Sequence, residues 1–191
     1  MSKILRQIVN MALSEDIGTG DLSSSLLVDN VTSAKIICRE KAIICGIDYS
    51  DLCFLSLDPD ITINWKIKEG EEAAPGYVIC HLEGKSQAII SAERTAINFL
   101  QTLSATATQT KHLVDMIKHT NAKLLDTRKT IPNLRYAQKY AVKCGGGVNH
   151  RMGLFDCVLL KENHILSIGS LEKSIEKALL EFPNKPVIVE V

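Results

Sequence analysis

The chain has 191 residues and no net formal charge, because 22 lysines and arginines balance 22 aspartates and glutamates. A protein without an overall positive field is not expected to hold DNA, RNA or an anionic membrane. No apolar run approaches the roughly 20 residues of a membrane-spanning helix, and residues 1–14 lack the apolar core and cleavage site of a secretory signal. We therefore expect a cytoplasmic globular protein with one large or two small domains.

Six cysteines are spread along the chain without a CxxC pair and without a neighbouring cluster of cysteine and histidine. Such spacing gives little support to a zinc site or a disulfide, so we expect no metal ligands among them. Free thiols, buried or half-buried, are typical of a protein in a reducing compartment. The six residues are Cys38, Cys45, Cys53, Cys80, Cys144 and Cys157.

The first hundred residues have the pattern of a small α+β unit. Apolar residues recur at helical spacing over 3–14, and the glycines and acids of 15–21 then end that helix. The β-branched residues of 33–47 predict two strands or one long bent strand, and 61–67 alternates like a half-buried strand. The other elements expected here are a short helix at 49–57 and a strand at 77–82.

A long helix is expected to begin at Ser91, a favourable capping residue that is followed by Glu93 in the first turn. Its apolar spacing continues, with a break, to His119. The pattern then changes to strand, helix, strand, helix, strand, which predicts right-handed βαβ units and a parallel sheet. These five elements are expected at 122–125, 134–144, 158–160, 171–180 and 187–189.

The last expected strand lies at the end of the sequence. A parallel sheet of about three strands with an unpaired edge would be a poor stable unit. Either the sequence is a piece of a longer protein, or another chain or element covers this edge. We favour the first explanation.

Charged residues follow three of the apolar runs. Buried parallel strands read as continuous apolar stretches, and their carboxyl ends are where α/β proteins place their chemistry. We therefore expect one face to gather several cations, which suits a small ligand with several carboxylates or phosphates. The alternative is a set of solvated salt bridges with Asp126, Asp156 and Glu162. The cations are Arg128, Lys129, His150, Arg151 and Lys161.

Gly145–Gly147 and Glu190 have two interpretations each. The glycines either end the preceding helix, or allow close approach to a ligand and aim His150 and Arg151 from a tight loop. No GK[ST] follows them, so they do not form a P-loop. Glu190 is either a polar strand end or a lone carboxylate that stabilises a positively charged transition state or helps to hold a metal.

Five segments together resemble the quinolinate phosphoribosyltransferase family, also called carboxylating nicotinate-nucleotide pyrophosphorylases. The likeness covers nearly the whole chain in the right order, and the segments around residues 126 and 150 are highly specific. The segments are Glu15–Asp21 (EDIGTGD), Glu93–Phe99 (ERTAINF), Asp126–Thr130 (DTRKT), Lys143–Arg151 (KCGGGVNHR) and Asp156–His164 (DCVLLKENH).

The resemblance implies an α/β fold: an N-terminal α/β sandwich domain (1–103) and the first part of an α/β barrel with parallel strands (104–191). It implies a homodimer that converts quinolinate and 5-phosphoribosyl-1-pyrophosphate to nicotinate mononucleotide, pyrophosphate and CO2, with Mg2+, in NAD biosynthesis. The arginine that matches Arg94 reaches the neighbouring subunit's site. Lys129, Lys161 and Glu190 are implied to be catalytic. The implied substrate-binding residues are Arg94, Thr127, Arg128, Lys129, His150, Arg151, Lys161 and Glu190.

Three alternatives remain open at this point. The chain could be a related pyrophosphorylase with a different acceptor. It could also be a truncated, inactive or binding-only paralogue, because family members continue past residue 191 with further barrel strands. Residues 65–82 also resemble a lipoyl or biotinyl carrier module. That class needs a lysine at the hairpin tip, whereas Lys66 and Lys68 lie before the turn.

Overall fold

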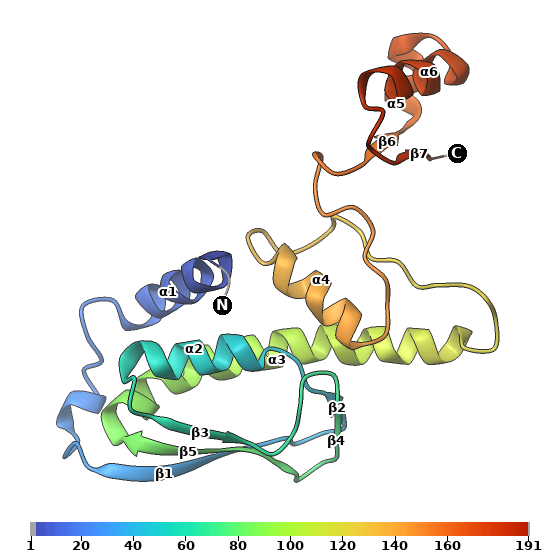
Figure 1. Cartoon of the computed structure of the whole chain (residues 1–191). Coiled ribbons are helices and arrows are strands. Elements are labelled where there is room, and N and C mark those ends of the chain that lie inside the picture. The colour runs from blue at the N-terminus through green and yellow to red at the C-terminus, as the bar shows by residue number, and fades with distance from the viewer. Residues whose placement is uncertain (1–2, 191) are drawn as a thin grey trace.

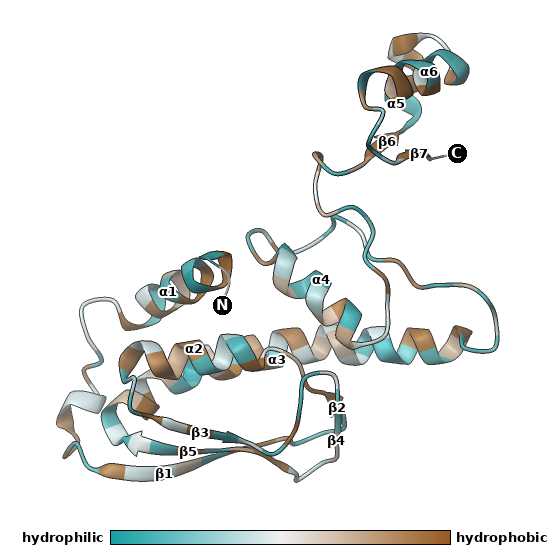
Figure 2. Ribbon diagram, in the orientation of Figure 1, coloured by the Kyte–Doolittle hydropathy of each residue, from teal (hydrophilic) through white to brown (hydrophobic). Residues whose placement is uncertain are grey.

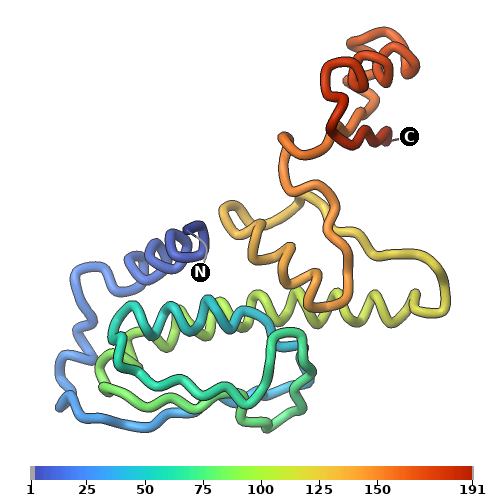
Figure 3. Tube along the Cα trace, viewed as in Figure 1, coloured from blue at the N-terminus to red at the C-terminus, as the bar shows by residue number. Residues whose placement is uncertain are grey.

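The computed structural model describes residues 3–190 (Figure 1). Helices lie over one face of a small antiparallel sheet in the N-terminal half. The chain then rises from the end of a long helix, through α4, to a separate group of short strands and helices (Figure 1). The trace in Figure 3 shows that this last group lies away from the N-terminal sheet, at the far end of the molecule.

The N-terminal sheet has three antiparallel strands in the order β1-β5-β3. Its strands are β1 (Val31–Ile37), β3 (Thr62–Trp65) and β5 (Val78–Lys85). A separate two-stranded pair joins β2 (Ala42–Ile43) to β4 (Glu72–Ala73). The segment 33–47 therefore contains two strands, as the first of its two interpretations held. The expected strands at 61–67 and 77–82 are confirmed as β3 and β5.

Two amphipathic helices and a 3-10 turn accompany this sheet. The first helix, α1 (Lys3–Ile17), buries Leu5, Val9 and Leu13, which are spaced four residues apart and share one face. It ends where Gly18 takes a left-handed conformation, with φ +55°. The other elements are η1 (Ser24–Leu26) and α2 (Ile47–Leu57), and α2 confirms the helix expected at 49–57.

The longest element, α3 (Ser86–Ile117), is one helix of 32 residues. The expected start at Ser91 and the expected break before His119 are wrong. Segment 104–110 is rich in serine and threonine, which favours a break, but its hydroxyls are satisfied without one. Ser104 and Thr108 contact the backbone of Cys45 and Ile43 outside the helix. Thr106 and Thr110 donate to carbonyl oxygens four residues earlier, at 3.1 and 2.7 Å. The boundary expected after residue 103 falls inside α3 and stays a prediction.

The C-terminal part contains a parallel βαβ unit. Strands β6 (Val158–Leu160) and β7 (Val187–Val189) pair in parallel, in the register that places Leu160 beside Val189. The helices α4 (Arg135–Cys144) and α6 (Leu171–Glu181) confirm two expected elements. The helix α5 (Glu162–Ile168) was not expected, because Gly169 interrupts the helical pattern between α5 and α6 with a φ of +110°.

The strand expected at 122–125 is wrong. Leu125 alone forms an isolated parallel bridge, with Val148, and it is 51% exposed. Residues 121–123 are also exposed, and the segment pairs with the rest of the described chain only at this bridge, so no extended ladder forms.

Apolar burial is concentrated in the N-terminal half. One buried cluster joins α1, α2, α3 and the sheet, and it includes only Ala137 and Ala141 from beyond α3. Figure 2 shows apolar segments of α2 and α3 in this layered region. All six cysteines are free, and four are buried and two half-buried, as expected. Among the described residues, no helix is both long enough and apolar enough to cross a membrane.

Candidate active site

A buried ion pair lies beneath the predicted site. The Lys139 ammonium group of α4 contacts the Asp126 carboxylate, and these side chains are only 1% and 7% exposed. Asp126 also accepts hydrogen bonds from the Asn149 side chain (2.5 Å) and the His150 backbone N–H (2.8 Å). Lys139 donates in addition to the His150 carbonyl at 3.2 Å. These contacts therefore fix the N–H and the carbonyl of His150, and they do not involve its imidazole ring.

The triple glycine lets the loop that carries His150 pack tightly. A Cβ atom on Gly145 would lie 2.3 Å from the Ala107 carbonyl oxygen of α3, and one on Gly147 would lie 2.6 Å from Val142 of α4. Gly146 has a left-handed φ of +87°. The loop thus needs glycine in order to press against the two helices and return toward Asp126. The glycines also end α4, because Gly145 is its C-cap, so the first interpretation is confirmed. The tight loop of the second interpretation is present, and the aiming of His150 and Arg151 stays a prediction.

Arg128 carries an unsatisfied buried donor. Its Nε atom is buried and has no hydrogen-bond partner among the described residues. A buried donor without a partner costs about 1–3 kcal/mol, so such groups are usually satisfied by a ligand or water. Thr127 and Lys129 lie beside Arg128 and line a small cavity of about 110 Å³, together with Lys139 of the buried pair. The Lys129 backbone N–H donates to the Thr127 hydroxyl at 3.0 Å.

The ends of β6 and β7 hold opposite charges side by side. Lys161 follows β6, Glu190 follows β7, and their side chains form an ion pair. This pairing lowers the pKa of Glu190, with smaller contributions from the charges of Lys129 and Arg151. Glu190 therefore lies in the combined field of three cations that come from three segments. These are three of the five residues that were expected to gather, and only Lys161 among them directly follows a strand.

Among residues 3–190, none of the five predicted cations forms a salt bridge with Asp126, Asp156 or Glu162, and the residue that pairs with Asp126 is Lys139. Lys161 pairs with Glu190 and not with Glu162. Asp156 accepts the backbone N–H groups of Met152 and Gly153, at 2.7 and 3.0 Å, and its pKa is lowered chiefly by the first of these. The Asp156 carboxylate thus stabilises the turn that follows the loop carrying His150.

His150 and Arg151 have different environments. Both residues are half-buried. Neither ring nitrogen of His150 makes a hydrogen bond to another described residue, whereas Arg151 donates from Nη1 to the Cys157 carbonyl at 3.4 Å. The His150 ring is therefore available to a ligand, and the Arg151 guanidinium keeps most of its donors free.

Arg94 is not part of this group. It is exposed on the first half of α3, and within the described chain no hydrogen bond or ion pair joins it to Arg128, His150 or Lys161. A larger cavity of about 190 Å³ lies between α1 and α3, beside Asp16 and Thr95, but none of the predicted site residues lines it. Of the eight predicted residues, seven thus lie on the 127–190 part of the chain and one lies elsewhere.

Lys139 and Asn149 were missed in the sequence as site residues. A signal was present for Lys139, because Ala137 and Ala141 mark the buried face of α4 and Lys139 lies between them. A lysine among buried positions requires a buried partner. The partner could not be identified, because Asp126 resembled a polar strand end.

The fold and the site define a two-part α/β protein with a cationic site at the carboxyl ends of parallel strands. Two family models match the chain: the N-terminal domain of quinolinate phosphoribosyl transferase over residues 21–104 and the C-terminal domain over residues 106–191. The chain belongs to the quinolinate phosphoribosyltransferase family. The match over 21–104 includes residues 65–82 and leaves the carrier-module alternative without support.

Named relatives agree with this assignment. The chain is 38% identical to quinolinate phosphoribosyltransferase [decarboxylating] 1b of Nicotiana tabacum, over 90% of the chain and 49% of the relative. It is 39% identical to a probable nicotinate-nucleotide pyrophosphorylase [carboxylating] of Bacillus subtilis, over 91% and 61%. The chain thus spans about half the length of the tobacco relative.

A solved structure confirms the fold class. The nicotinate-nucleotide pyrophosphorylase from Francisella tularensis is 48% identical to the chain and superposes with a TM-score of 0.97, over 98% of this chain and 67% of that one. The predicted architecture, an N-terminal sheet domain followed by part of an α/β barrel, is therefore correct.

Proposed function

We propose that this protein transfers the phosphoribosyl group of 5-phosphoribosyl-1-pyrophosphate to quinolinate, with loss of CO2, to give nicotinate mononucleotide and pyrophosphate. The observation that carries the proposal is the buried, unpartnered Nε of Arg128 beside the cationic cluster. A diacid on an aromatic ring offers paired oxygens to such a donor, and the free ring of His150 and the guanidinium of Arg151 supply further contacts.

The proposed reaction needs both negative and positive groups around the ribose and the pyrophosphate, and this site contains both. The quinolinate nitrogen attacks the anomeric carbon of the donor, the bond to pyrophosphate breaks, and the ribose gains oxocarbenium character. Glu190 is the carboxylate that we assign to stabilise this positive charge, and Lys129 and Lys161 balance the leaving and attacking anions. The ribosylated ring nitrogen is cationic, so the ring accepts the electron pair when the bond to the 2-carboxylate breaks. A proton from solvent then replaces CO2.

Buried polar contacts supply the positioning that this mechanism needs. No covalent nucleophile is required, so the rate depends on orientation and on electrostatics. The contacts of Asp126 and Lys139 with the Asn149 side chain and the His150 backbone hold the loop that carries His150.

We propose Mg2+ as the accompanying ion. It prefers oxygen ligands and is usually bound by one or two carboxylates together with substrate phosphates. Within residues 3–190, no group of three carboxylates or imidazoles converges beside Glu190, and Glu190 itself is paired with Lys161. Residues 3–190 would therefore play only a supporting part in binding Mg2+. The ion would bind largely through the donor's pyrophosphate oxygens and would screen their charge.

We propose a homodimer in which Arg94 completes the site of the neighbouring subunit. Support comes from its exposed position on α3, apart from the other cations of its own chain. A cytoplasmic location is also a proposal, because the names of some relatives place them in mitochondria or chloroplasts.

Pyrophosphate release in the presence of quinolinate, Mg2+ and the donor tests the proposed reaction. We expect turnover with quinolinate and none with nicotinate. Turnover with nicotinate would favour a pyrophosphorylase with a different acceptor. Calorimetric binding of quinolinate without turnover would favour a binding-only paralogue, and absence of both would overturn the proposal.

Complementation tests the shared site. Arg94→Ala and Arg151→Ala subunits are each expected to be inactive alone. A mixture of the two should recover part of the activity, because some heterodimers then contain one intact site. No recovery in verified heterodimers would contradict the dimer proposal.

A further inference from the structure

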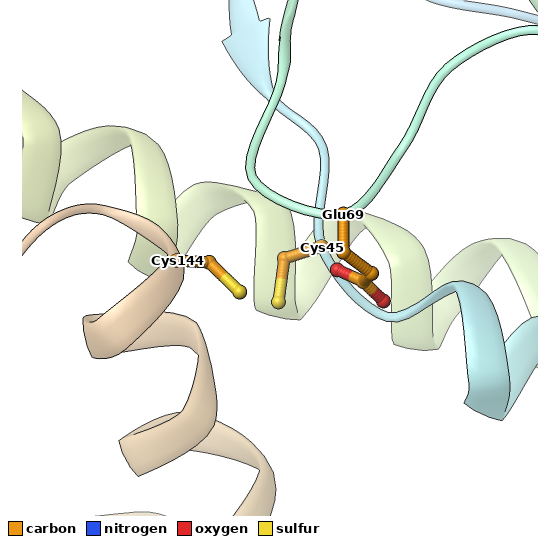
Figure 4. Close-up of side chains that lie close together, drawn as sticks. All are labelled: Cys45, Glu69 and Cys144. Carbon is orange, nitrogen blue, oxygen red and sulfur yellow. The ribbon is translucent and has the colours of Figure 1, made fainter.

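Three potential metal ligands meet at a point that the proposed reaction does not use. Cys45 lies between β2 and α2, Glu69 lies in the turn between β3 and β4, and Cys144 is the last residue of α4 (Figure 4). The two sulfur atoms and a carboxylate oxygen all lie within 4.8 Å of one another. Figure 4 shows both cysteine side chains directed into the same space, with Glu69 beside Cys45.

Backbone contacts hold two of these groups in place. Glu69 Oε1 accepts the N–H groups of Gly46 (2.9 Å) and Ile47 (2.7 Å), and Oε2 has one longer contact with Gly46 at 3.2 Å. The Cys45 N–H donates to the Ser104 hydroxyl at 3.0 Å, and its carbonyl accepts from that hydroxyl at 3.2 Å. The contacts to α2 account for the position of Glu69, but they do not explain why two thiols converge on it.

The three groups are buried or half-buried and share one small space. Desolvation by burial is the main cause that raises the pKa of Cys45, Glu69 and Cys144, and it favours their protonated forms. No lysine or arginine is among the groups that shift these pKa values. A ligand site is therefore indicated by the geometry, in which two sulfur atoms and a carboxylate oxygen converge within 4.8 Å.

We propose that Cys45, Glu69 and Cys144 form a binding site for a zinc-like divalent metal ion, with two thiolates and one carboxylate oxygen as the protein ligands. Thiolate ligands select zinc and similar ions, and Zn–S bonds of about 2.3 Å place tetrahedral ligand atoms roughly 3.8 Å apart. Because the ligand atoms all lie within 4.8 Å of one another, no pair has to close by more than about 1 Å to reach that geometry. Each thiol loses one proton to solvent on binding, and water or the Tyr140 hydroxyl fills the fourth position.

Such an ion would join two parts of the molecule. Cys45 and Glu69 belong to the N-terminal unit, while Cys144 precedes the glycine loop that leads to His150. Metal binding would tie the end of α4 to the N-terminal unit. The half-buried position of Cys144 gives the ion a route from solvent.

Titration of the reduced, metal-free full chain with Co2+ tests the proposal. We expect one ion per chain, with sulfur-to-cobalt charge-transfer absorption in the near ultraviolet and displacement by Zn2+. Cys45→Ser and Cys144→Ser should each abolish this absorption, and Glu69→Gln should weaken binding at least tenfold while still accepting the backbone hydrogen bonds of α2. The matched control is Cys53→Ser, which changes another buried cysteine and should bind Co2+ like the unaltered protein.

A second measurement keeps the test decisive if a variant folds poorly. Zn2+ should raise the melting temperature of the unaltered protein and of Cys53→Ser, but not that of the Cys45→Ser/Cys144→Ser double variant. Charge-transfer bands that persist in the double variant would overturn the proposal. A reduced, folded protein that binds no Co2+ would also overturn it. This includes the case in which the two thiols form a disulfide on oxidation but bind no metal. Neither assay contains quinolinate or a phosphoribosyl donor, so its outcome is independent of the proposed reaction.

Discussion

Residues 3–117 and residues 147–190 are stabilised in different ways. In the N-terminal unit, side chains such as Val9, Cys53 and Leu103 are completely buried in one apolar cluster. In the segment after the glycine loop, Leu154, Phe155 and Leu180 are 73%, 68% and 83% exposed. The N-terminal unit thus gains most from apolar burial, whereas the apolar side chains of the later segment remain largely uncovered within the described chain.

Charged contacts are prominent where apolar burial is sparse. The Asp126–Lys139 pair lies at the junction of the two regions, and the Lys161–Glu190 pair joins the ends of the two parallel strands. The first pair is buried and the second is about half exposed. Apolar burial is thus concentrated in the N-terminal unit, while paired charges hold together segments that have little apolar cover.

The largest expected effect comes from breaking the buried pair at the junction. Lys139→Ala should lower the free energy of unfolding by about 3–5 kcal/mol, because the Asp126 carboxylate would stay buried without its partner. Urea denaturation followed by circular dichroism measures this loss. The control is Lys111→Ala, which removes an exposed pair with Asp115 and should cost less than about 0.5 kcal/mol. Equal losses in the two variants would contradict the role of burial.

The contrast in apolar burial can be tested with matched leucines. Leu103→Ala should cost about 2–5 kcal/mol of unfolding free energy, because Leu103 is completely buried. Leu180→Ala changes a residue that is 83% exposed and should stay within about 0.5 kcal/mol of the unaltered protein. The same denaturation assay measures both variants. A similar cost at the two positions would remove the difference between the regions.

Quinolinate binding provides a further test, of the polar residues that follow the N-terminal unit. Arg128→Ala should weaken quinolinate binding by roughly 2–4 kcal/mol, because a ligand carboxylate would lose its charged partner. Calorimetry measures the change. Arg6→Ala, which removes an exposed arginine from α1, is the control and should bind normally. Unchanged affinity in Arg128→Ala would exclude Arg128 from the binding site.

The smallest expected effect is a shift in titration at the strand ends. The pKa of Glu190 should lie below the ordinary value of 4.5, because Lys161 stabilises the carboxylate. Because this pKa is depressed, the Lys161–Glu190 pair contributes to stability at pH values above the pKa of the unfolded state. That contribution is lost as the pH falls through the pKa of the folded state. Carbon NMR of the Glu190 carboxyl group measures the pKa. Lys161→Met should move it back toward 4.5, and no movement would contradict the pairing.

The sequence predicted those parts of the fold that depend on local patterns. Periodicity located most helices and the β6-α-β7 unit, because helix and parallel strand impose distinct spacings. It placed the start of α3 five residues late, since Ser91 is a good capping residue and yet lies inside the helix. Whether a serine caps a helix depends on where the preceding strand ends, which no local pattern records.

The candidate site was proposed from residues that are adjacent in the sequence. Arg128, Lys161 and Glu190 were selected because polar residues follow apolar runs, and their roles stay predictions. The buried partners of Asp126 and the grouping of Cys45 with Cys144 were not found, because they join segments that are far apart in the chain. Such contacts depend on tertiary packing, and the cysteine spacing gave no sign of them.

The continuity of α3 has a consequence for motion. A helix of 32 residues is about 48 Å long, and the two family domains meet near residue 105, inside it. Bending there would break several backbone hydrogen bonds at once, so the two domains cannot swing about a flexible linker at this point. The first stretch after α3 that contains no helix or strand is residues 118–134, so the nearest place where the chain can bend without breaking a helix carries Arg128 and Lys129.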